Sequence, residues 1–401
     1  MITINPTVRS QAKSAIKFAA CATLTAIAVS LHGTQATASA PHATGLGNVL
    51  TSKDGGEIFG FGIDQTGDSG VIATSQDTDS GYRVSVETFD QNTGKIIKSF
   101  AKDDGPRNSY SVDGVFEGDV GLITHYIVPQ GQIYPRRRYE VMNPIAANAF
   151  TARWTPPPKD IDVRMASTDQ STATSVLFAI ELKKQDQPVL LVSDIAANTF
   201  SNVIPLDPNL FGGANGPQLA QFTSANKAVI ALSPDGGTRH GQPPINALID
   251  LSSGKIVQFD GYNNGYYHAG GVNGLAVDPD TGVAATDTEL NAQVEFYDLK
   301  KKQGITFQQL PCTTDTDQLS SGSGISVDPV NKLFLVTERL YCDGSQGSAI
   351  VVYDEQGNEV ETITGFHFFI GETAPVLNPS KRMAWAFGGP QGWSQLQQFF
   401  Y

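Results

Sequence analysis

The sequence predicts an all-β fold, a single seven-bladed β-propeller whose N-terminal and C-terminal strands close one blade. Three observations carry this prediction. Strand-turn-strand hairpins recur along the chain, a marker strand follows them at intervals near 50 residues, and the last repeat lacks one strand while the N-terminal part has one to spare. Repeats of this length are typical of propeller blades.

The hairpins are clearest from Gly274 to Thr288 and from Gly324 to Glu338, where an Asp-Pro turn separates two apolar strands. Asp and Pro favour turns because the Asp side chain bonds nearby backbone groups and Pro fixes φ. A looser copy spans 375–388, and 62–75 keeps the same order of strand, polar turn and strand. We therefore expect each repeat to contain the same pair of strands.

A marker strand that ends in Asp or Asn and enters a turn follows each of the first six hairpins. These strands end at Asp90, Asn143, Asp194, Asp250, Asp298 and Asp354, with spacings of 48 to 56 residues. A further strand follows the marker, as at 95–100 and 255–259. Each unit therefore reads as four strands, the first of them innermost.

The two ends of the repeat array complement each other. The final unit stops at Tyr401, where a seventh marker is due, and an unassigned strand at 46–51 precedes the first blade. We expect this strand to complete the last blade, which removes an open edge. Six or eight blades stay open as counts, because the units around 111–148 and 163–203 are the most degenerate. An open β-solenoid or a pair of sandwiches is the structural alternative.

The G-[LI]-[AS]-V-D-P pattern at Gly274 and Gly324 resembles the YVTN and NHL type of propeller repeat. The resemblance implies the propeller fold. That group includes binding and assembly modules, lactonases of the phosphogluconolactonase and gluconolactonase types, and quinoprotein-like dehydrogenases. No catalytic motif of these families can be assigned to numbered residues here.

Residues 1–38 have the layout of a cleaved signal peptide. Basic residues precede an uncharged, mainly apolar stretch of 14 residues at 18–31, and Ala36 and Ala38 form a small-residue cleavage site. The stretch is shorter than the roughly 20 residues of a spanning helix. We therefore expect 39–401 to be the mature propeller, periplasmic or secreted, with no membrane span.

The expected mature chain is strongly acidic. It keeps 24 of the 27 Lys and Arg residues against all 40 Asp and Glu residues. Such a surface repels phosphate backbones and anionic lipid heads, so we expect neither nucleic acid nor a membrane surface as partner. A small molecule, a glycan or a protein is the expected partner of a monomeric chain.

One face of the ring is expected to carry the function. Strand direction alternates within a blade, so the connections between blades and the loops between second and third strands emerge together. Cys312 and Cys342 both fall on this face, and in an oxidising compartment they predict a disulfide. Two buried free thiols are the alternative. The longer, chemically richer loops of this face make it the expected binding face.

The connection at 261–274 is the most distinctive, because its aromatic rings, imidazole and glycines could close over a sugar-like or aromatic ligand. A plug of packed tyrosines is the alternative interpretation. The ligand-binding candidates on this face are Tyr266, Tyr267, His268, Asn273, Arg239, His240, Glu289 and Glu372.

Asn273 and Glu372 lie near the starts of innermost strands, where oxygen ligands of a channel-bound Ca²⁺ would converge. Capping of strand ends is the ordinary alternative. Gluconolactonase-type propellers use a channel cation, so a lactonase-like hydrolase with a divalent cation is the alternative function. We favour a ligand-binding or protein-binding module. A quinone-dependent dehydrogenase is disfavoured because only three tryptophans are available for stacking. The sequence leaves catalysis, catalytic residues and cofactor undecided.

Overall fold

The structure is a computed structural model of the 401-residue chain, which divides into Met1–Pro41 and His42–Tyr401. Only the second unit contains described residues. The structure describes 45–401 except for 54, 65–66, 80, 105–108, 118–119, 128–135, 143–160, 170–173, 182–186, 195–198, 206–218, 225–226, 233–244, 252, 261–271, 289–292, 310–320, 343–344, 368–373 and 389–393. In β6–β10, β13, β14 and β16, as bounded below, it describes the backbone alone.

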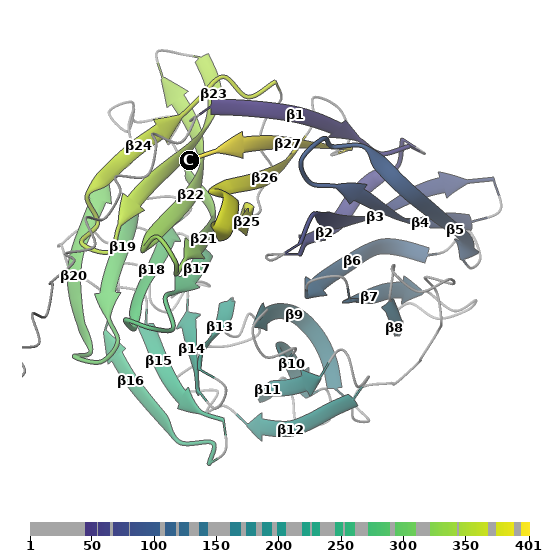
Figure 1. Ribbon diagram of the computed structural model, residues 1–401. Coiled ribbons are helices and arrows are strands. Elements are labelled where there is room, and N and C mark those ends of the chain that lie inside the picture. Colours follow the sequence, from purple (N-terminus) through teal and green to yellow (C-terminus); the bar gives the residue numbers. More distant parts are fainter. Residues whose placement is uncertain are drawn as a thin grey trace, which may run out of the picture. The chain divides into compact units, whose positions relative to one another are not determined.

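The described strands form seven antiparallel sheets, which we call blades 1 to 7 (Figure 1). Blade 1 contains β2 (Glu57–Ile63), β3 (Ser69–Thr78), β4 (Gly81–Asp90) and β5 (Ile96–Asp104). Blade 2 contains β6 (Ser109–Glu117), β7 (Val120–Ile127) and β8 (Arg136–Met142). Blade 3 contains β9 (Ile161–Asp169), β10 (Thr174–Glu181), β11 (Gln187–Asp194) and β12 (Thr199–Pro205).

The remaining blades follow the same order. Blade 4 contains β13 (Leu219–Ser224), β14 (Lys227–Leu232), β15 (Ile245–Asp250) and β16 (Ile256–Asp260). Blade 5 contains β17 (Val272–Val277), β18 (Val283–Thr288), β19 (Gln293–Asp298) and β20 (Gln303–Gln309). Blade 6 contains β21 (Ser321–Asp328), β22 (Leu333–Cys342), β23 (Ser345–Asp354) and β24 (Glu359–Ile363). Blade 7 contains β25 (Val376–Asn378), β26 (Met383–Gly388), β27 (Gln395–Phe400) and β1 (Gly45–Thr51).

The first strand of each blade is innermost. β2 contacts β6, β6 contacts β9, and the series continues through β13, β17, β21 and β25, which in turn contacts β2 (Figure 1). Successive sheets therefore pack around a common centre, as in a β-propeller. The all-β propeller predicted from the sequence is the fold that the structure shows.

The last blade takes its outer strand from the N-terminal part of the chain. β1 pairs antiparallel with β27, with Gly45 opposite Phe400 and Thr51 opposite Gln395. Side chains reinforce the pair, because Asn48 donates from both its backbone and side-chain nitrogens to Oε1 of Gln398 at 3.0 Å. Blade 7 thus joins two segments that are 350 residues apart.

The Asp-Pro hairpins owe their turns to one side chain each. Oδ1 of Asp278 accepts hydrogen bonds from the backbone N–H groups of Asp280 and Thr281, and Oδ1 of Asp328 does the same two and three residues later. The fifth turn residue is left-handed in both, Gly282 at φ 78° and Lys332 at φ 58°. A local carboxylate acceptor therefore defines the turn.

Apolar side chains fill the spaces between blades. Between blades 5 and 6, the rings of Phe334 and Tyr353 meet Phe296 edge-on at centroid distances of 5.7 and 5.6 Å. Between blades 7 and 1, Trp385 and Phe89 meet at 5.2 Å, and both are fully buried. Alternate residues of a strand face opposite sides of its sheet, and blades 5, 6 and 7 each contribute apolar residues to two junctions.

Candidate functional site

The two ends of the sheets carry connections of different length. On one end, β14 stops at Leu232 and β15 begins at Ile245, β16 stops at Asp260 and β17 begins at Val272. On the other, β17 stops at Val277 and β18 begins at Val283. We call the first end the loop face; there the described strands stop before, and resume after, 206–218, 233–244, 261–271 and 310–320. The second is the turn face, formed by turns such as 278–282, 328–332 and 355–358.

The residues predicted to bind a ligand belong to the loop face by their place in the chain. Tyr266, Tyr267, His268, Arg239, His240, Glu289, Glu372 and Cys312 lie outside the described residues. Asn273 lies in β17 and Cys342 ends β22, but their side chains are outside the description. The predicted binding cluster, the channel Ca²⁺ and the disulfide therefore stay predictions.

Two buried carboxyl groups lie beneath the loop face, where blades 5 and 6 meet. Asp287 is the penultimate residue of β18, Glu338 lies in the second half of β22, and neither has exposed surface. Oδ2 of Asp287 accepts the backbone N–H of Gly324 at 3.0 Å, a bond that crosses from one blade to the next. Asp287 therefore joins the second strand of blade 5 to the inner strand of blade 6.

A close approach of the inner strands of these blades explains the Gly at the start of the repeat. A Cβ atom at Gly274 would lie 2.6 Å from the backbone nitrogen of Ile325 and 2.9 Å from Oδ2 of Asp287. Contacts below 3.0 Å require the neighbours to move. Gly274 is thus needed for the packing of β17 against β21.

Glu338 has an environment that disfavours its charge. Burial raises the pKa of its carboxyl group well above the usual value, the charges of Glu359 and Asp287 raise it further, and the hydroxyl of Tyr353 opposes this rise. That hydroxyl lies 3.5 Å from Oε1, a long contact, and Oε2 has no hydrogen-bond partner. Burial also raises the pKa of Tyr353, with Glu338 as the next cause.

The other side of blade 5 carries a second buried polar group. The hydroxyl of Tyr297 donates a short hydrogen bond to Oε2 of Glu295 and lies 3.2 Å from Oγ1 of Thr286. All three residues are buried. Neither this group nor the Glu338 group is open to solvent, so these residues contribute to the packing of the sheets.

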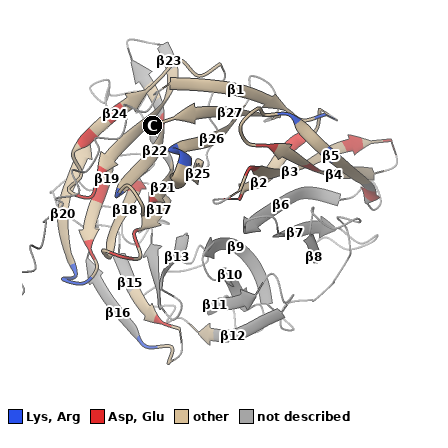
Figure 2. Ribbon diagram, in the orientation of Figure 1, with Lys and Arg blue, Asp and Glu red and all other residues tan. Residues whose placement is uncertain are grey.

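The turn face links blades through charges. Nζ of Lys332 lies 3.0 Å from Oδ2 of Asp278 and 3.1 Å from Oδ2 of Asp280 in the preceding blade. Burial opposes the charge of Lys332, but hydrogen bonds to both carboxylates outweigh it and raise the pKa of its ammonium group. Figure 2 shows that basic positions lie mainly at turns, whereas acidic positions also lie within strands.

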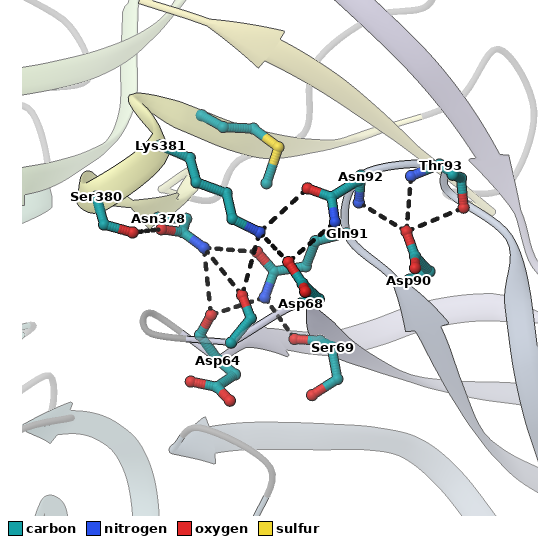
Figure 3. Close-up of polar contacts among 12 residues, drawn as sticks. Asp64, Asp68, Ser69, Asp90, Gln91, Asn92, Thr93, Asn378, Ser380 and Lys381 are labelled. Atoms are coloured by element: carbon teal, nitrogen blue, oxygen red, sulfur yellow. Dashed lines mark hydrogen bonds and ion pairs between the residues drawn. The ribbon is translucent and has the colours of Figure 1, made fainter.

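A polar network joins blades 7 and 1 on the same face (Figure 3). Nδ2 of Asn378 donates to Oε1 of Gln91 at 3.0 Å, and Nε2 of Gln91 donates to the carbonyl groups of Asp64 and Ser69 at 2.7 and 2.5 Å. At its rim Lys381 pairs with Asp68, and this hydrogen bond lowers the pKa of the Asp68 carboxyl group. The seam that closes the ring is therefore held by uncharged side chains inside and an ion pair outside.

Metal binding has no support in the part of the chain that the structure describes, where no three His, Cys, Asp or Glu side chains form a group suited to an ion. Within the same residues, no helix has the length and apolar character needed to cross a membrane. Neither finding bears on the loop-face connections.

Sequence reasoning missed the two buried carboxyl groups. Asp287 and Glu338 each continue an apolar strand, after Val283–Thr286 and after Leu333–Thr337, at positions where the pattern calls for an uncharged residue. A charged residue within such a run is itself a signal, because charges are rarely fully buried unless they are paired. Which face of the strand they occupy depends on packing.

No protein-family model and no curated protein sequence matches the chain. Solved structures do match. Raptor of Chaetomium thermophilum aligns with TM-score 0.58 and 11% identity over 89% of this chain and 29% of that one, so the chain spans less than a third of that Raptor chain. The Cps50 (Swd1) β-propeller domain of Myceliophteria thermophila aligns with TM-score 0.57 and 12% identity over 90% and 100% of the two chains. The Pan2 WD40 domain of Neurospora crassa aligns with TM-score 0.56 and 12% identity over 88% and 93%. Identities this low establish the fold alone: the chain is a β-propeller.

Proposed function

We propose that the mature chain, residues 39–401, is exported to the periplasm or secreted and binds a partner protein through its loop face. The proposal rests on the different lengths of the connections at the two ends of the sheets. Four of the longest, 206–218, 233–244, 261–271 and 310–320, follow one another along blades 3 to 6 at the same end of the sheets. Loops on a rigid scaffold are where binding residues usually lie.

The extent of this surface favours a protein over a small molecule. A protein interface uses roughly 20–30 residues on each side, and these four connections supply more residues than that. Their tyrosines, Arg239 and His268 are of the types enriched in such interfaces or suited to their rims. A glycan would use the same aromatic residues, and the test below separates the two.

Site-specific photo-crosslinking tests the proposal. A photoreactive amino acid at position 267 on the loop face is compared with one at position 356 on the turn face, both in the exported protein of the producing cells. A protein adduct formed from position 267 and not from 356, and reproduced with the purified partner, is expected. Equal adducts from both positions, or glycan binding by the purified chain that Tyr267→Ala abolishes, would contradict a protein-binding loop face.

Two further measurements test the remaining parts of the proposal. Intact mass of the exported protein should place its first residue at Ser39. Lactone hydrolysis by the purified chain in the presence of Ca²⁺, lost on Glu372→Gln, would replace the binding function with the hydrolase alternative.

A further inference from the structure

The junction between blades 5 and 6 contains an acidic group that the binding function does not use. Asp287 of β18 and Glu338 of β22 are both fully buried, and the charge of Asp287 acts on the Glu338 carboxyl group. Burying a single charge without a partner is strongly unfavourable, and burying two of the same sign is worse. Glu338, whose Oε2 has no hydrogen-bond partner, is the group for which a neutral state removes that cost.

The hydrogen bonds identify which group stays charged. Oδ2 of Asp287 accepts the N–H of Gly324 at 3.0 Å, which favours a carboxylate there. Oε2 of Glu338 has no partner, and Oε1 has only the long 3.5 Å contact with the hydroxyl of Tyr353. Glu338 is therefore the group that holds the proton.

Among the groups that the structure describes, none supplies a compensating cation to Glu338. The titratable groups that act on it are Glu359 of β24, Asp287 of β18 and Tyr353 of β23, and none of these described groups is positively charged. The ring of Tyr353 meets Phe296 edge-on, and Phe296 meets Phe334 in the same apolar cluster. An ionised Glu338 would repel both neighbouring carboxylates within an apolar junction.

We propose that the junction of blades 5 and 6 is a proton-operated seam, closed while the Glu338 carboxyl group holds its proton and loosened when it releases it. The proton passes to solvent, and the negative charge left on Glu338 repels Asp287 across the junction. β18 and β22 lead directly into the loop-face segments 289–292 and 343–344, so loosening begins next to that face.

The direction of the pH dependence follows from the raised pKa of Glu338. A group whose pKa is higher in the packed state binds more protons in that state. Its contribution to the free energy of packing is therefore complete below the unpacked glutamate pKa of about 4.3. The contribution is lost as the pH rises toward the packed-state pKa. Within that window the equilibrium constant for opening rises by up to about tenfold per pH unit.

Hydrogen exchange across a pH series tests the seam directly and requires no ligand. Peptides covering 274–287 and 324–338 are followed from about pH 5 to about pH 8, with correction for the intrinsic pH dependence of exchange. Protection in the wild-type chain should fall as pH rises. Glu338→Gln should stay protected at every pH, and Asp287→Asn should show a smaller fall.

A matched control and a second measurement complete the test. Glu87→Gln alters an equally buried glutamate in blade 1, whose oxygens accept from the N–H of Lys53 at 3.1 Å and the hydroxyl of Ser99 at 3.4 Å, and it should leave the pH response of the seam unchanged. Infrared spectra at the low-pH end of this series should show a protonated carboxyl group that is missing from Glu338→Ala. The same pH response in wild type and Glu338→Gln, or no such carboxyl signal in the wild-type chain, overturns the proposal.

Discussion

Nζ of Lys332 in blade 6 lies 3.0 Å from Oδ2 of Asp278 in blade 5, a carboxylate with no exposed surface. Lys332 itself keeps about a third of its side-chain surface in solvent and also contacts the exposed Asp280. The pair spans two blades, so it fixes their relative position on the turn face. Asp278 has a second role that Lys332 lacks, because it also accepts the N–H groups of Asp280 and Thr281 in its own turn.

Replacing Lys332 with Met should lower the free energy of unfolding by about 1–2 kcal/mol, because the buried Asp278 loses its cation while solvent screens part of the loss. Urea denaturation of the purified chain measures this. Lys301→Met is the matched control, since Lys301 pairs with Asp298 with most of its own surface exposed, and it should change stability by less than about 0.5 kcal/mol. Equal losses of unfolding free energy in the two variants would mean that the burial of Asp278 does not increase the contribution of its ion pair.

The ion pair between Lys332 and Asp278 should also make the stability of the chain depend on pH in the alkaline range. The pKa of Lys332 is raised in the folded chain, so its contribution is fully present below the ordinary lysine value of about 10.4 and is lost as pH rises through the folded value. Thermal unfolding of wild type and Lys332→Met should therefore differ most at neutral pH, and the two curves should converge at strongly alkaline pH. A constant difference over the whole range would contradict this linkage.

Gly274→Ala should destabilise the chain by about 1–3 kcal/mol, because the new Cβ meets backbone and carboxylate atoms that have little room to move. Gly347→Ala is the control: a Cβ there meets nothing within 4 Å, and its effect should lie near zero or be slightly stabilising. Differential scanning calorimetry of the two single variants decides the matter. If Gly274→Ala left the stability unchanged, the close approach of β17 and β21 would not explain the glycine at this position.

Gln91→Ala should weaken the seam between blades 7 and 1 by about 2–3 kcal/mol, because it removes three hydrogen bonds that the buried Gln91 makes to Asn378 and to two backbone carbonyl groups. Hydrogen exchange should rise most in peptides covering 57–70 and 376–388. Gln356→Ala, an exposed turn residue of blade 6, serves as control. A uniform rise over all blades would mean that Gln91 supports global stability and not the seam.

Much of the architecture was accessible from the sequence because the repeat is local. The hairpins at 274–288 and 324–338 coincide with β17–β18 and β21–β22, and the marker residues Asp90 and Asp354 cap turns through their own carboxylates. The strand expected at 46–51 is present as Gly45–Thr51 beside β27. The candidate binding residues were predicted from the same repeat pattern. Their position in the repeat assigns them to the loop face but does not show which of them contact one another.

The sequence by itself determined the clearest hairpins and their turns and left six or eight blades open, since alternation of apolar residues and Asp-Pro turns are properties of neighbouring positions. Only the tertiary structure decided which side chains meet between blades. Asp287 and Glu338 are 51 positions apart and Gln91 and Asn378 are 287 apart, and no periodic pattern states whether two such groups face each other. Packing of adjacent sheets brings them together, and exclusion of water there turns ordinary polar residues into a seam and a proton-binding site.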